Sequence, residues 1–435
     1  MEPATVFIFA LLLLFVLLAL RMPIAIALAI VSAGGIFFIR GPRAAMSMLG
    51  SETHSFAAHW TLSAIPMFLL MGAFAFHGGL TTSLFKAGRI WLSRLPGGLA
   101  VATNVATAMF AASSGSSLAT SAAMTRLAAP EMLKAGYAPS LATSVIACAG
   151  TIGALIPPSI LFVVYAWYAQ EHVGKLLMAG LLPGILTAVI YSLLIILRCK
   201  FNPSLAPAVD DHFSWRDRFS VLKEIWPIPF LIVVVMGSIY GGVATATEAA
   251  ALGSVATLAL VIARGDFSFS FFRGSVADAL SSSASIFFVA LAAALFSKLL
   301  ALSGIPPIVG DFIERSQMSE LQLILVVVVL YLLLGLFLDP IGILLITLPI
   351  LLPAFETLDM NLIWMGVIIV KMIEIGLLTP PVGLNVFVVK SVVGDQVELR
   401  DIFRGVMWFL LAEIVIMALI IAFPQISLVL PNMMD

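Results

Sequence analysis

The chain has 435 residues, of which 62% are hydrophobic and 10% are charged, and its net charge is −1. Soluble domains carry about 25% charged residues and disordered chains are poor in apolar residues, so this composition excludes both classes. The apolar runs are long and continuous, which predicts an all-α polytopic membrane protein and not a barrel of short alternating strands. Two cysteines cannot form a disulfide framework, and the net charge gives no sign of nucleic-acid binding.

Eight uninterrupted segments approach the roughly 20 apolar residues that a spanning helix requires. They are 5–20, 24–40, 60–79, 176–197, 225–242, 246–263, 281–302 and 405–423. The first has no basic leader and no small-residue cleavage site, so we expect it to be retained as a helix. Four further apolar regions are interrupted near their middles by Pro, Gly or Ser, and these are 99–128, 138–168, 321–353 and 362–392.

The basic residues between these segments predict the orientation of the chain. With the N-terminus outside, most Lys and Arg residues fall on the inside, provided that 99–128 and 321–353 each enter and leave the membrane on one side. Both regions are therefore predicted to be re-entrant hairpins. The polar stretch 198–224 is expected to be an inside linker. Basic and apolar residues alternate in 80–96, which predicts an amphipathic helix at the inner interface.

A motif recurs in the two halves of the chain, 223 residues apart. Residues 152–164 read IGALIPPSILFVV and residues 375–387 read IGLLTPPVGLNVF. The same offset places Ser116 on Asp339, so each half contains a hairpin with a polar tip, followed by a helix broken at Pro-Pro. One break alone would indicate a kink, and one small-residue tip alone would indicate close helix packing. Two matched pairs favour an internal repeat.

An odd number of crossings separates the two hairpins, so we expect them to enter from opposite faces. Such inverted repeats are typical of secondary transporters whose site lies at the midplane. Proline lacks an N–H and interrupts a helix, and irregular backbone at membrane depth is tolerated only against protein or a wet cavity. The carbonyls freed there can bind a cation, and helix N-termini favour an anion.

These motifs resemble those of the large membrane subunit of TRAP (tripartite ATP-independent periplasmic) transporters, the DctM-like permeases. The resemblance covers nearly the whole chain. It rests on 113–117 with 119–123, Pro130-Glu131-Met132, Gly136-Tyr137, 150–159, 247–250, Asp339-Pro340 and 379–385. Ala246 and Arg126 depart from the family pattern.

The resemblance implies an elevator-type secondary transporter of the bacterial inner membrane, with a periplasmic N-terminus and a transport domain that moves against a scaffold. On this division, 1–98 hold scaffold helices and the interfacial arm helix, and 99–168 hold the first hairpin and broken helix. Residues 176–302 hold scaffold helices with the cytoplasmic linker 198–224. Residues 303–392 hold the second hairpin and broken helix, and 393–435 a C-terminal scaffold helix.

The resemblance also implies partners and a coupling ion. The partners are a small membrane subunit of about four helices on a separate chain, a periplasmic substrate-binding protein and membrane lipid. The solute would be a carboxylate-bearing organic acid, such as a C4-dicarboxylate or a sialic acid, and Na⁺ would drive its import. No organic cofactor is expected.

Two Na⁺ sites are predicted at the breaks, because hydroxyl, carbonyl and carboxylate oxygens suit a hard cation. The first would use Ser113, Ser114, Gly115 and Ser116 at the first tip, with Thr151, Gly153 and Ile156 at the first break. The second would use Asp339 with Thr379, Pro380 and Gly383, although Asp339 also suits a helix cap or a salt bridge.

The substrate carboxylate is predicted to lie near Ser116, Ser117, Thr120 and Asn385. Arg126 is a further candidate, but its distance along the helix favours extension to the interface. Lys298, Lys371, Glu248 and Glu374 are charged residues at membrane depth, for which a functional role and simple pairing are both open. Glu374 is the strongest of these, because it directly precedes the second break.

Three other classes of protein are alternatives to a TRAP permease. A stand-alone ion-coupled carboxylate transporter of the same wider architecture is the nearest alternative, and a channel is the second. An intramembrane hydrolase is the third, but no histidine lies inside a broken region and no HExxH or GxSxG motif occurs. The sequence therefore predicts that the protein is not an enzyme.

Overall fold

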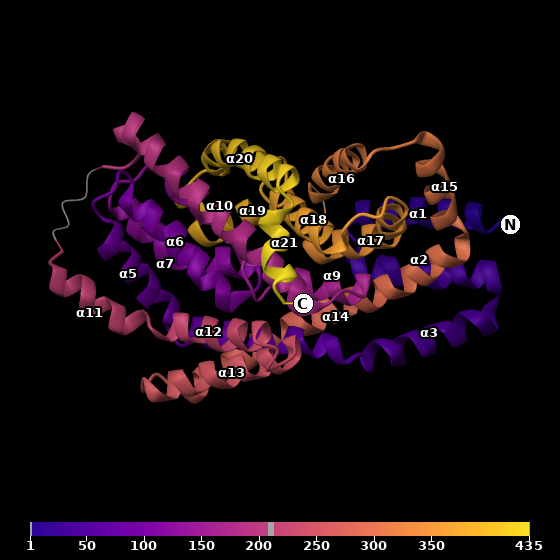
Figure 1. Cartoon of the computed structure of the whole chain (residues 1–435), viewed down its shortest axis with the longest axis horizontal. Coiled ribbons are helices and arrows are strands. Elements are labelled where there is room, and N and C mark those ends of the chain that lie inside the picture. The colour runs from indigo at the N-terminus through magenta and orange to yellow at the C-terminus, as the bar shows by residue number, and fades with distance from the viewer. Residues whose placement is uncertain (1, 208–212, 337, 435) are drawn as a thin grey trace.

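The computed structural model describes residues 2–207, 213–336 and 338–434, which form helices and connections without a strand (Figure 1). Residues 208–212 of the predicted linker and Phe337 of the predicted second tip lie outside the described residues. A helix occurs at each of the eight predicted uninterrupted segments. These helices are α1 (Pro3–Ala19), α2 (Ile24–Arg40), α4 (Ala64–His77), α10 (Val173–Phe201), α12 (Pro227–Tyr240), α13 (Ala246–Ala263), α14 (Phe269–Ser303) and α20 (Leu399–Ala422).

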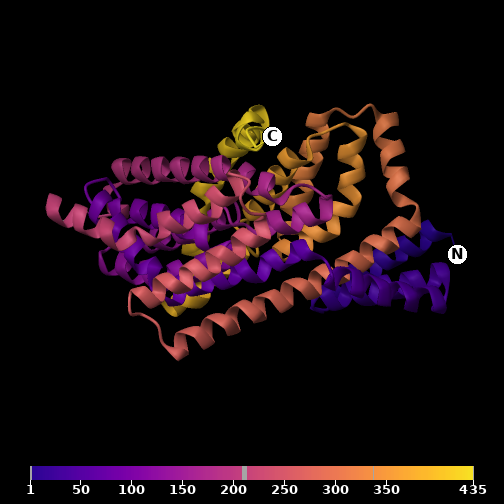
Figure 2. The same cartoon turned by 60° about the horizontal axis from the view of Figure 1, so that its bottom comes forward.

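Six helical segments in the described part of the chain are long and apolar enough to cross a membrane, or seven if the bent pair α11 (Trp215–Ile225) and α12 counts as one. The six are 60–77, α10, α13, α14, α17 (Pro340–Thr357) and α20. α14 has 35 residues and begins earlier than predicted, and Figure 2 shows it running obliquely along one side of the molecule. α17, which belongs to the predicted second hairpin, is itself long enough to span.

Four α-helices were not predicted: α3 (Pro42–Ala57), α11 within the predicted linker, α15 (Ile305–Ser316) and α21 (Gln425–Asn432). They are short, and only Ala45 and Phe56 are buried in α3. Hydropathy over a span-length window does not detect such helices. The predicted amphipathic helix is confirmed as α5 (Leu80–Leu92), which buries apolar residues on one side.

All four predicted interruptions are confirmed. The first hairpin consists of α6 (Gly98–Ser114) and α7 (Ser117–Lys134), and the first broken helix of α8 (Pro139–Gly150), a 3-10 turn (Thr151–Ala154) and α9 (Ile160–Ala169). The second hairpin region consists of α16 (Glu320–Gly335) and α17, and the second broken helix of α18 (Leu362–Gly376) and α19 (Leu384–Val393).

Local chemistry explains where the helices stop and restart. Gly115 has φ +69°, a left-handed conformation that suits glycine, and it ends α6. The side chains of Ser116, Ser159 and Asp339 each accept a hydrogen bond from the first turn of the following helix. The Pro-Pro peptide bond is cis at both breaks. Ser116 and Asp339, which are matched by the repeat, thus have the same capping role, and the two Pro-Pro bonds have the same conformation.

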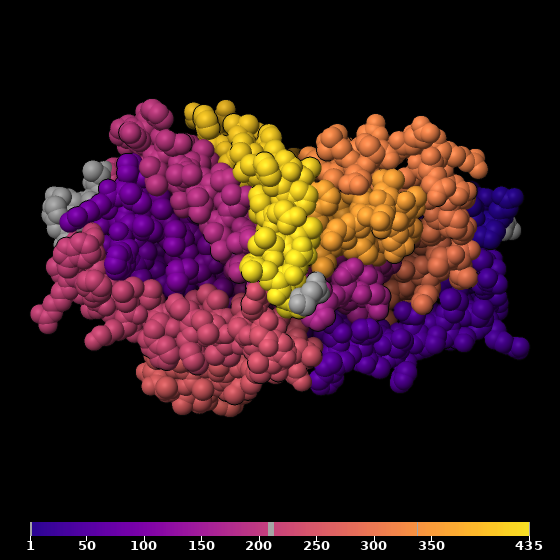
Figure 3. All heavy atoms as spheres, in the orientation of Figure 1, coloured from indigo at the N-terminus to yellow at the C-terminus, as the bar shows by residue number. Residues whose placement is uncertain are grey.

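The helices pack as an inner group and an outer group. α6, α7, α8 and α9 pack together with α10, α18, α19 and α20, whereas α14 packs against α1, α2, α3 and α4, and α13 against α4. The C-terminal helices α20 and α21 lie between the first-half and second-half parts of the surface (Figure 3). Of the helices predicted as scaffold, α10 packs on α6, α9 and α18 as well as on α21, and α20 packs on α8, α18 and α19. The division into a scaffold and a transport domain stays a prediction.

Gly405 allows α20 to approach α8 closely. A Cβ atom built at Gly405 would lie 2.1 Å from the Ser140 carbonyl oxygen and 2.5 Å from the Ser144 hydroxyl. We expect Gly405→Ala to lower the free energy of unfolding by about 1–3 kcal/mol, because the helix backbones must separate. Thermal unfolding of the purified protein measures this effect. Gly50→Ala in α3 is the matched control, since nothing lies within 4 Å of its built Cβ; an equal loss in both variants would contradict the prediction.

Candidate functional site

The tip of the first hairpin packs directly against the first break. The Ile160 N–H donates to the Gly115 carbonyl oxygen at 3.2 Å. A Cβ atom built at Gly153 would lie 2.8 Å from the Thr120 hydroxyl and 3.1 Å from the Ser116 carbonyl oxygen. The structure thus brings together Gly115, Ser116 and Gly153 of the predicted first Na⁺ site, and Thr120 of the predicted substrate site.

The hydroxyl groups at this tip are buried and form short local hydrogen bonds. Thr120 Oγ1 donates to Ser114 Oγ at 2.9 Å, and Ser113 Oγ donates to the Phe110 carbonyl at 2.9 Å. Thr151 Oγ1 donates to the Cys148 carbonyl at 2.6 Å. Each hydroxyl oxygen keeps acceptor capacity beside these bonds, so the tip offers several oxygens within a small, buried volume.

Ile156, the last residue of the predicted first site, contacts α10. Its side chain packs close to Gly184 of α10, where a built Cβ would lie 2.6 Å away. α4 is a further neighbour of the tip, since a Cβ atom built at Gly72 would lie 2.7 Å from the Ser113 carbonyl oxygen. The first tip is therefore enclosed by the first break on one side and by α4 on another.

A buried hydrogen bond joins the first hairpin to the second broken helix. Ser117 Oγ at the start of α7 donates to Glu374 Oε1 at the end of α18, at 3.0 Å, and both side chains are buried. The other carboxylate oxygen of Glu374 has no hydrogen-bond partner among the described residues. Asn385 Nδ2 lies 3.5 Å from the Ala147 carbonyl of α8, and Asn385 Oδ1 is likewise without a protein partner. Ser117 and Asn385, predicted near the substrate, thus lie where the second broken helix meets the first half.

The second tip is arranged differently. Asp339 is half-buried and caps α17, with Oδ1 accepting from the Gly342 N–H at 2.9 Å. It borders a cavity of about 610 Å³ together with Leu338 and Arg21 of the connection between α1 and α2. Thr379 Oγ1 donates to the Ile375 carbonyl of its own helix at 2.8 Å. Among the described residues, no side-chain hydrogen bond connects Asp339 to the break at Thr379, Pro380 and Gly383.

Arg126 is exposed on α7, eight residues before the end of the helix, and no ion pair of the described chain includes it. Lys298 pairs with Glu52 at 3.5 Å and is half-exposed. Glu248 is exposed and forms a capping box with Thr245 at the start of α13. Pairing thus accounts for Lys298 and capping for Glu248, two of the four charged residues that the sequence left open; Lys371 is also paired, but it is buried.

Lys371 belongs to a buried polar network that the sequence interpretation missed. Its ammonium group lies 2.7 Å from Glu413 Oε1 of α20 and 3.1 Å from Thr187 Oγ1 of α10. Tyr191 of α10 donates a hydrogen bond to the same Glu413 oxygen. Lys371 and Glu413 are almost fully buried. The available signal was one acidic residue in the apolar run 405–423.

Comparisons with known proteins identify the family. The family model described as the DctM component of the tripartite ATP-independent periplasmic transporters matches residues 11–426. The C4-dicarboxylate TRAP transporter large permease protein DctM of Pseudomonas aeruginosa is 37% identical, over 86% of this chain and 87% of that protein. The sialic acid TRAP transporter large permease protein SiaM of Vibrio cholerae is 29% identical, over 90% of this chain and 89% of that protein.

A solved structure is similar in fold alone. The YdaH transporter of Alcanivorax borkumensis has a TM-score of 0.63 and 15% identity, over 88% of this chain and 89% of that chain. The family model covers nearly the whole chain, and the resemblance inferred from the sequence motifs is confirmed. The chain belongs to the DctM family of large permease components of tripartite ATP-independent periplasmic transporters.

Proposed function

We propose that this permease imports a carboxylate-bearing organic solute across the bacterial inner membrane, driven by Na⁺, in a complex with a small membrane subunit and a periplasmic substrate-binding protein. The observation that carries this proposal is the meeting of the two repeats at the Ser117–Glu374 contact. In inverted-repeat transporters, substrate and ions bind where broken helices of the two repeats meet. The related permeases are named for C4-dicarboxylate and for sialic acid, and both solutes carry carboxylates.

The first cation site is proposed at the first tip and the first break. Ser114, Gly115, Ser116 and Gly153 lie together there, and hydroxyl and carbonyl oxygens are the ligands that a hard cation takes. The second site is proposed at Asp339 with the second break. Among the described residues, no side-chain hydrogen bond joins its two parts, so binding at this site would draw the second tip and the second break together.

The substrate carboxylate is proposed to lie near Ser117, Thr120 and Asn385, beside the N-termini of α7 and α19. These helix ends present N–H groups and a positive dipole end. Asn385 contributes a buried amide whose oxygen has no protein partner in the described chain. Arg126 is exposed on α7, which favours its extension toward the membrane interface.

The elevator motion is proposed to carry α10 and α20 together with the hairpins. α10 packs on α9, α20 packs on α8, and both pack on α18. Lys371 of α18 forms buried polar contacts with α10 and α20. Breaking such contacts in every cycle would expose a buried charge to lipid. The scaffold would then consist mainly of α1–α4 and α12–α14, with a periplasmic N-terminus as the basic residues indicate.

Uptake into proteoliposomes tests the proposal. We expect accumulation of a labelled organic acid only when the permease, the small subunit and the liganded binding protein are all present and a Na⁺ gradient is imposed. Accumulation without the binding protein would favour a stand-alone carboxylate transporter of the same wider architecture. Equal uptake in a K⁺ gradient would contradict Na⁺ coupling.

Asp339→Asn in the same assay tests the second cation site. Asparagine caps a helix as well as aspartate does, so the fold of α17 is preserved while the charge is lost. We expect the Na⁺ concentration for half-maximal uptake to rise about 10- to 100-fold, because a charged ligand contributes about 1.5–3 kcal/mol. Ser319→Ala removes the cap of α16 without altering a predicted site and is the control. An unchanged Na⁺ dependence in Asp339→Asn would refute this assignment.

A further inference from the structure

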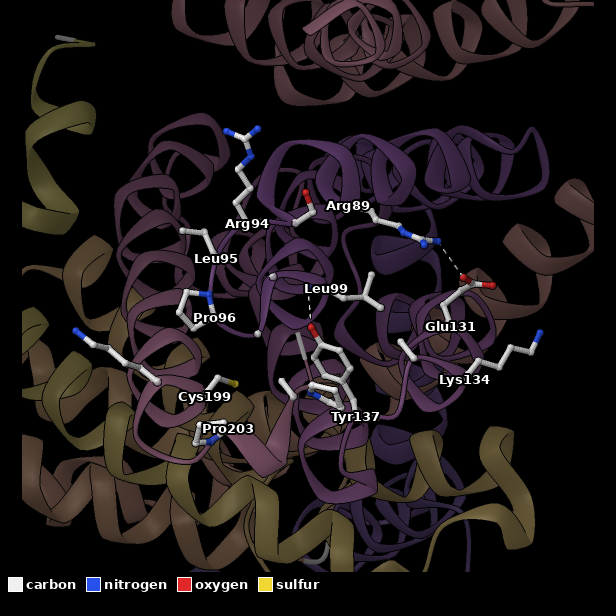
Figure 4. A pocket seen from close by; sticks show the side chains of 17 residues that line it. Arg89, Arg94, Leu95, Pro96, Leu99, Glu131, Lys134, Tyr137, Cys199 and Pro203 are labelled. Carbon is white, nitrogen blue, oxygen red and sulfur yellow. Dashed lines mark hydrogen bonds and ion pairs between the residues drawn. The ribbon is translucent and has the colours of Figure 1, made fainter. Parts of the chain in front are cut away.

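A cavity of about 720 Å³ lies at the start of α6 and the end of α7, the opposite ends of these helices from the tip of the first hairpin. Figure 4 shows the side chains that line it. Its walls are the connection between α5 and α6, the ends of α7 and α10, and the connections that follow these two helices. This volume falls within the range of small-molecule sites. On the orientation proposed above, the cavity opens at the cytoplasmic end of the membrane helices.

Basic side chains dominate the walls of this cavity. They are Arg89, Arg94, Lys134 and Lys200, against a single acidic side chain, Glu131. Arg89 lies 3.4 Å from Glu131, which offsets one positive charge. Arg94, Lys134 and Lys200 are exposed, so their charged groups form a basic rim. Three positive charges around one cavity attract an anion.

The floor of the cavity is largely apolar with the hydroxyl group of Tyr137, and Ser93 adds a second hydroxyl group to the wall. Leu99 and Gly97 are buried there, and Leu95 and Pro96 form part of the wall. Tyr137 is buried, and its oxygen accepts a hydrogen bond from the Leu99 N–H at 3.1 Å, as Figure 4 shows. Its own hydrogen remains available for donation. An apolar floor with one donor and a basic rim suits an amphipathic anion better than a small hydrated one.

We propose that this cavity binds the phosphate group of an anionic phospholipid from the inner leaflet. Basic pockets between membrane helices on the cytoplasmic side are suited to anionic headgroups. The end of α10 continues the apolar surface outward through Phe201, which is 82% exposed, so acyl chains have a surface to follow. Arg198 one turn earlier stacks on Trp408, which is typical of the interfacial region.

The bound headgroup would link the arm helix to the transport domain. Residues 93–97 connect α5 to α6, and Gly97 there has φ +69° and lies against Cys199 of α10. A phosphate group bound by Arg94 of this connection, by Lys134 of α7 and by Lys200 of α10 would bridge the connection to both helices. The lipid thereby stabilises the position of the hairpin relative to α5.

Lipid binding to the purified full-length chain, measured by native mass spectrometry, tests this inference. Phosphatidylglycerol is expected to bind at least about tenfold more tightly than phosphatidylcholine. Lys134→Gln with Lys200→Gln is expected to weaken phosphatidylglycerol binding about tenfold or more, since each basic residue contributes near an anionic lipid. Arg216→Gln with Lys223→Gln removes the same charge from exposed positions of α11 outside the cavity, and it should leave the affinity unchanged.

The variant Lys134→Arg with Lys200→Arg keeps both charges and should retain the affinity, which separates loss of charge from loss of folding. Equal weakening by the cavity pair and the α11 pair would overturn the proposal. Equal binding of phosphatidylcholine would do the same. Displacement of the lipid by glycerol 3-phosphate at an equal concentration would show that the cavity selects a free phosphate, and it would overturn the lipid assignment.

Discussion

Replacing Glu413 with alanine is expected to lower the free energy of unfolding by about 3–5 kcal/mol, because Lys371 would be left as a buried charge without its counterion. The two groups lie 2.7 Å apart, with 0% and 2% of their side chains exposed. Tyr191 would also lose its hydrogen-bond acceptor. Unfolding of the purified protein in mixed micelles, followed by circular dichroism, measures the change.

Two controls separate the loss of a partner from the loss of packing. Lys371→Met combined with Glu413→Gln should recover most of the stability, because replacing a whole buried pair is often nearly neutral. Lys298→Met breaks the half-exposed pair with Glu52 and should cost less than about 1 kcal/mol. The interpretation fails if Glu413→Ala costs no more than Lys298→Met.

Glu374→Gln is expected to reduce Na⁺-dependent uptake about 10- to 100-fold while leaving thermal stability unchanged or higher. Lys371 is already paired with Glu413, so an ionised Glu374 would have no ion-pair partner among the described residues. A buried carboxylate without a partner is costly unless a proton or a cation supplies the missing charge. We therefore predict that the charge of Glu374 serves the transport cycle, with the magnitude set by one charged interaction.

Ser117→Ala is the matched variant for this test, because it removes the hydrogen bond at 3.0 Å and keeps the carboxylate. It should reduce uptake less than Glu374→Gln does. Glu356→Gln changes an exposed carboxylate at the end of α17 and should have no effect. Wild-type uptake by Glu374→Gln, at equal protein levels, would show that Glu374 is only a packing residue.

The two experiments examine adjacent turns of α18. Lys371 faces α10 and α20, and Glu374 contacts the start of α7, so one broken helix connects the C-terminal helix with the first hairpin. A loss of stability in Glu413→Ala would show that the Lys371–Glu413 pair stabilises the packing of the inner group. A loss of transport in Glu374→Gln would assign the Ser117–Glu374 pair to the site. Because Lys371, the partner of Glu413, lies three positions before Glu374, combining Glu413→Ala with Glu374→Gln tests whether the effects are independent.

The sequence by itself determined the helical class, the eight uninterrupted segments, the four interruptions, the internal repeat and the family. The hydropathy of a span, the effect of proline on a helix and the conformational freedom of glycine depend on nearby residues in the sequence. The helices and their interruptions can therefore be predicted from local sequence. Short helices such as α3 and α15 were not predicted, because they lack an apolar run long enough to span a membrane. Asp339 was predicted both as a cation ligand and as a cap; the structure shows the cap, and the ligand role stays a proposal.

Only the tertiary structure decided which polar groups meet. Ser117 and Glu374 are 257 residues apart, and Lys371 and Glu413 are 42 apart, so no local pattern relates them. Their pairing depends on how α7, α18 and α20 pack, which is set by close approaches such as Gly405 against Ser140. Burying a charge is costly unless it has a partner, and this can be stated from the sequence. That Lys371 pairs with Glu413, and that one oxygen of Glu374 has no partner among the described residues, depends on the packing of the helices.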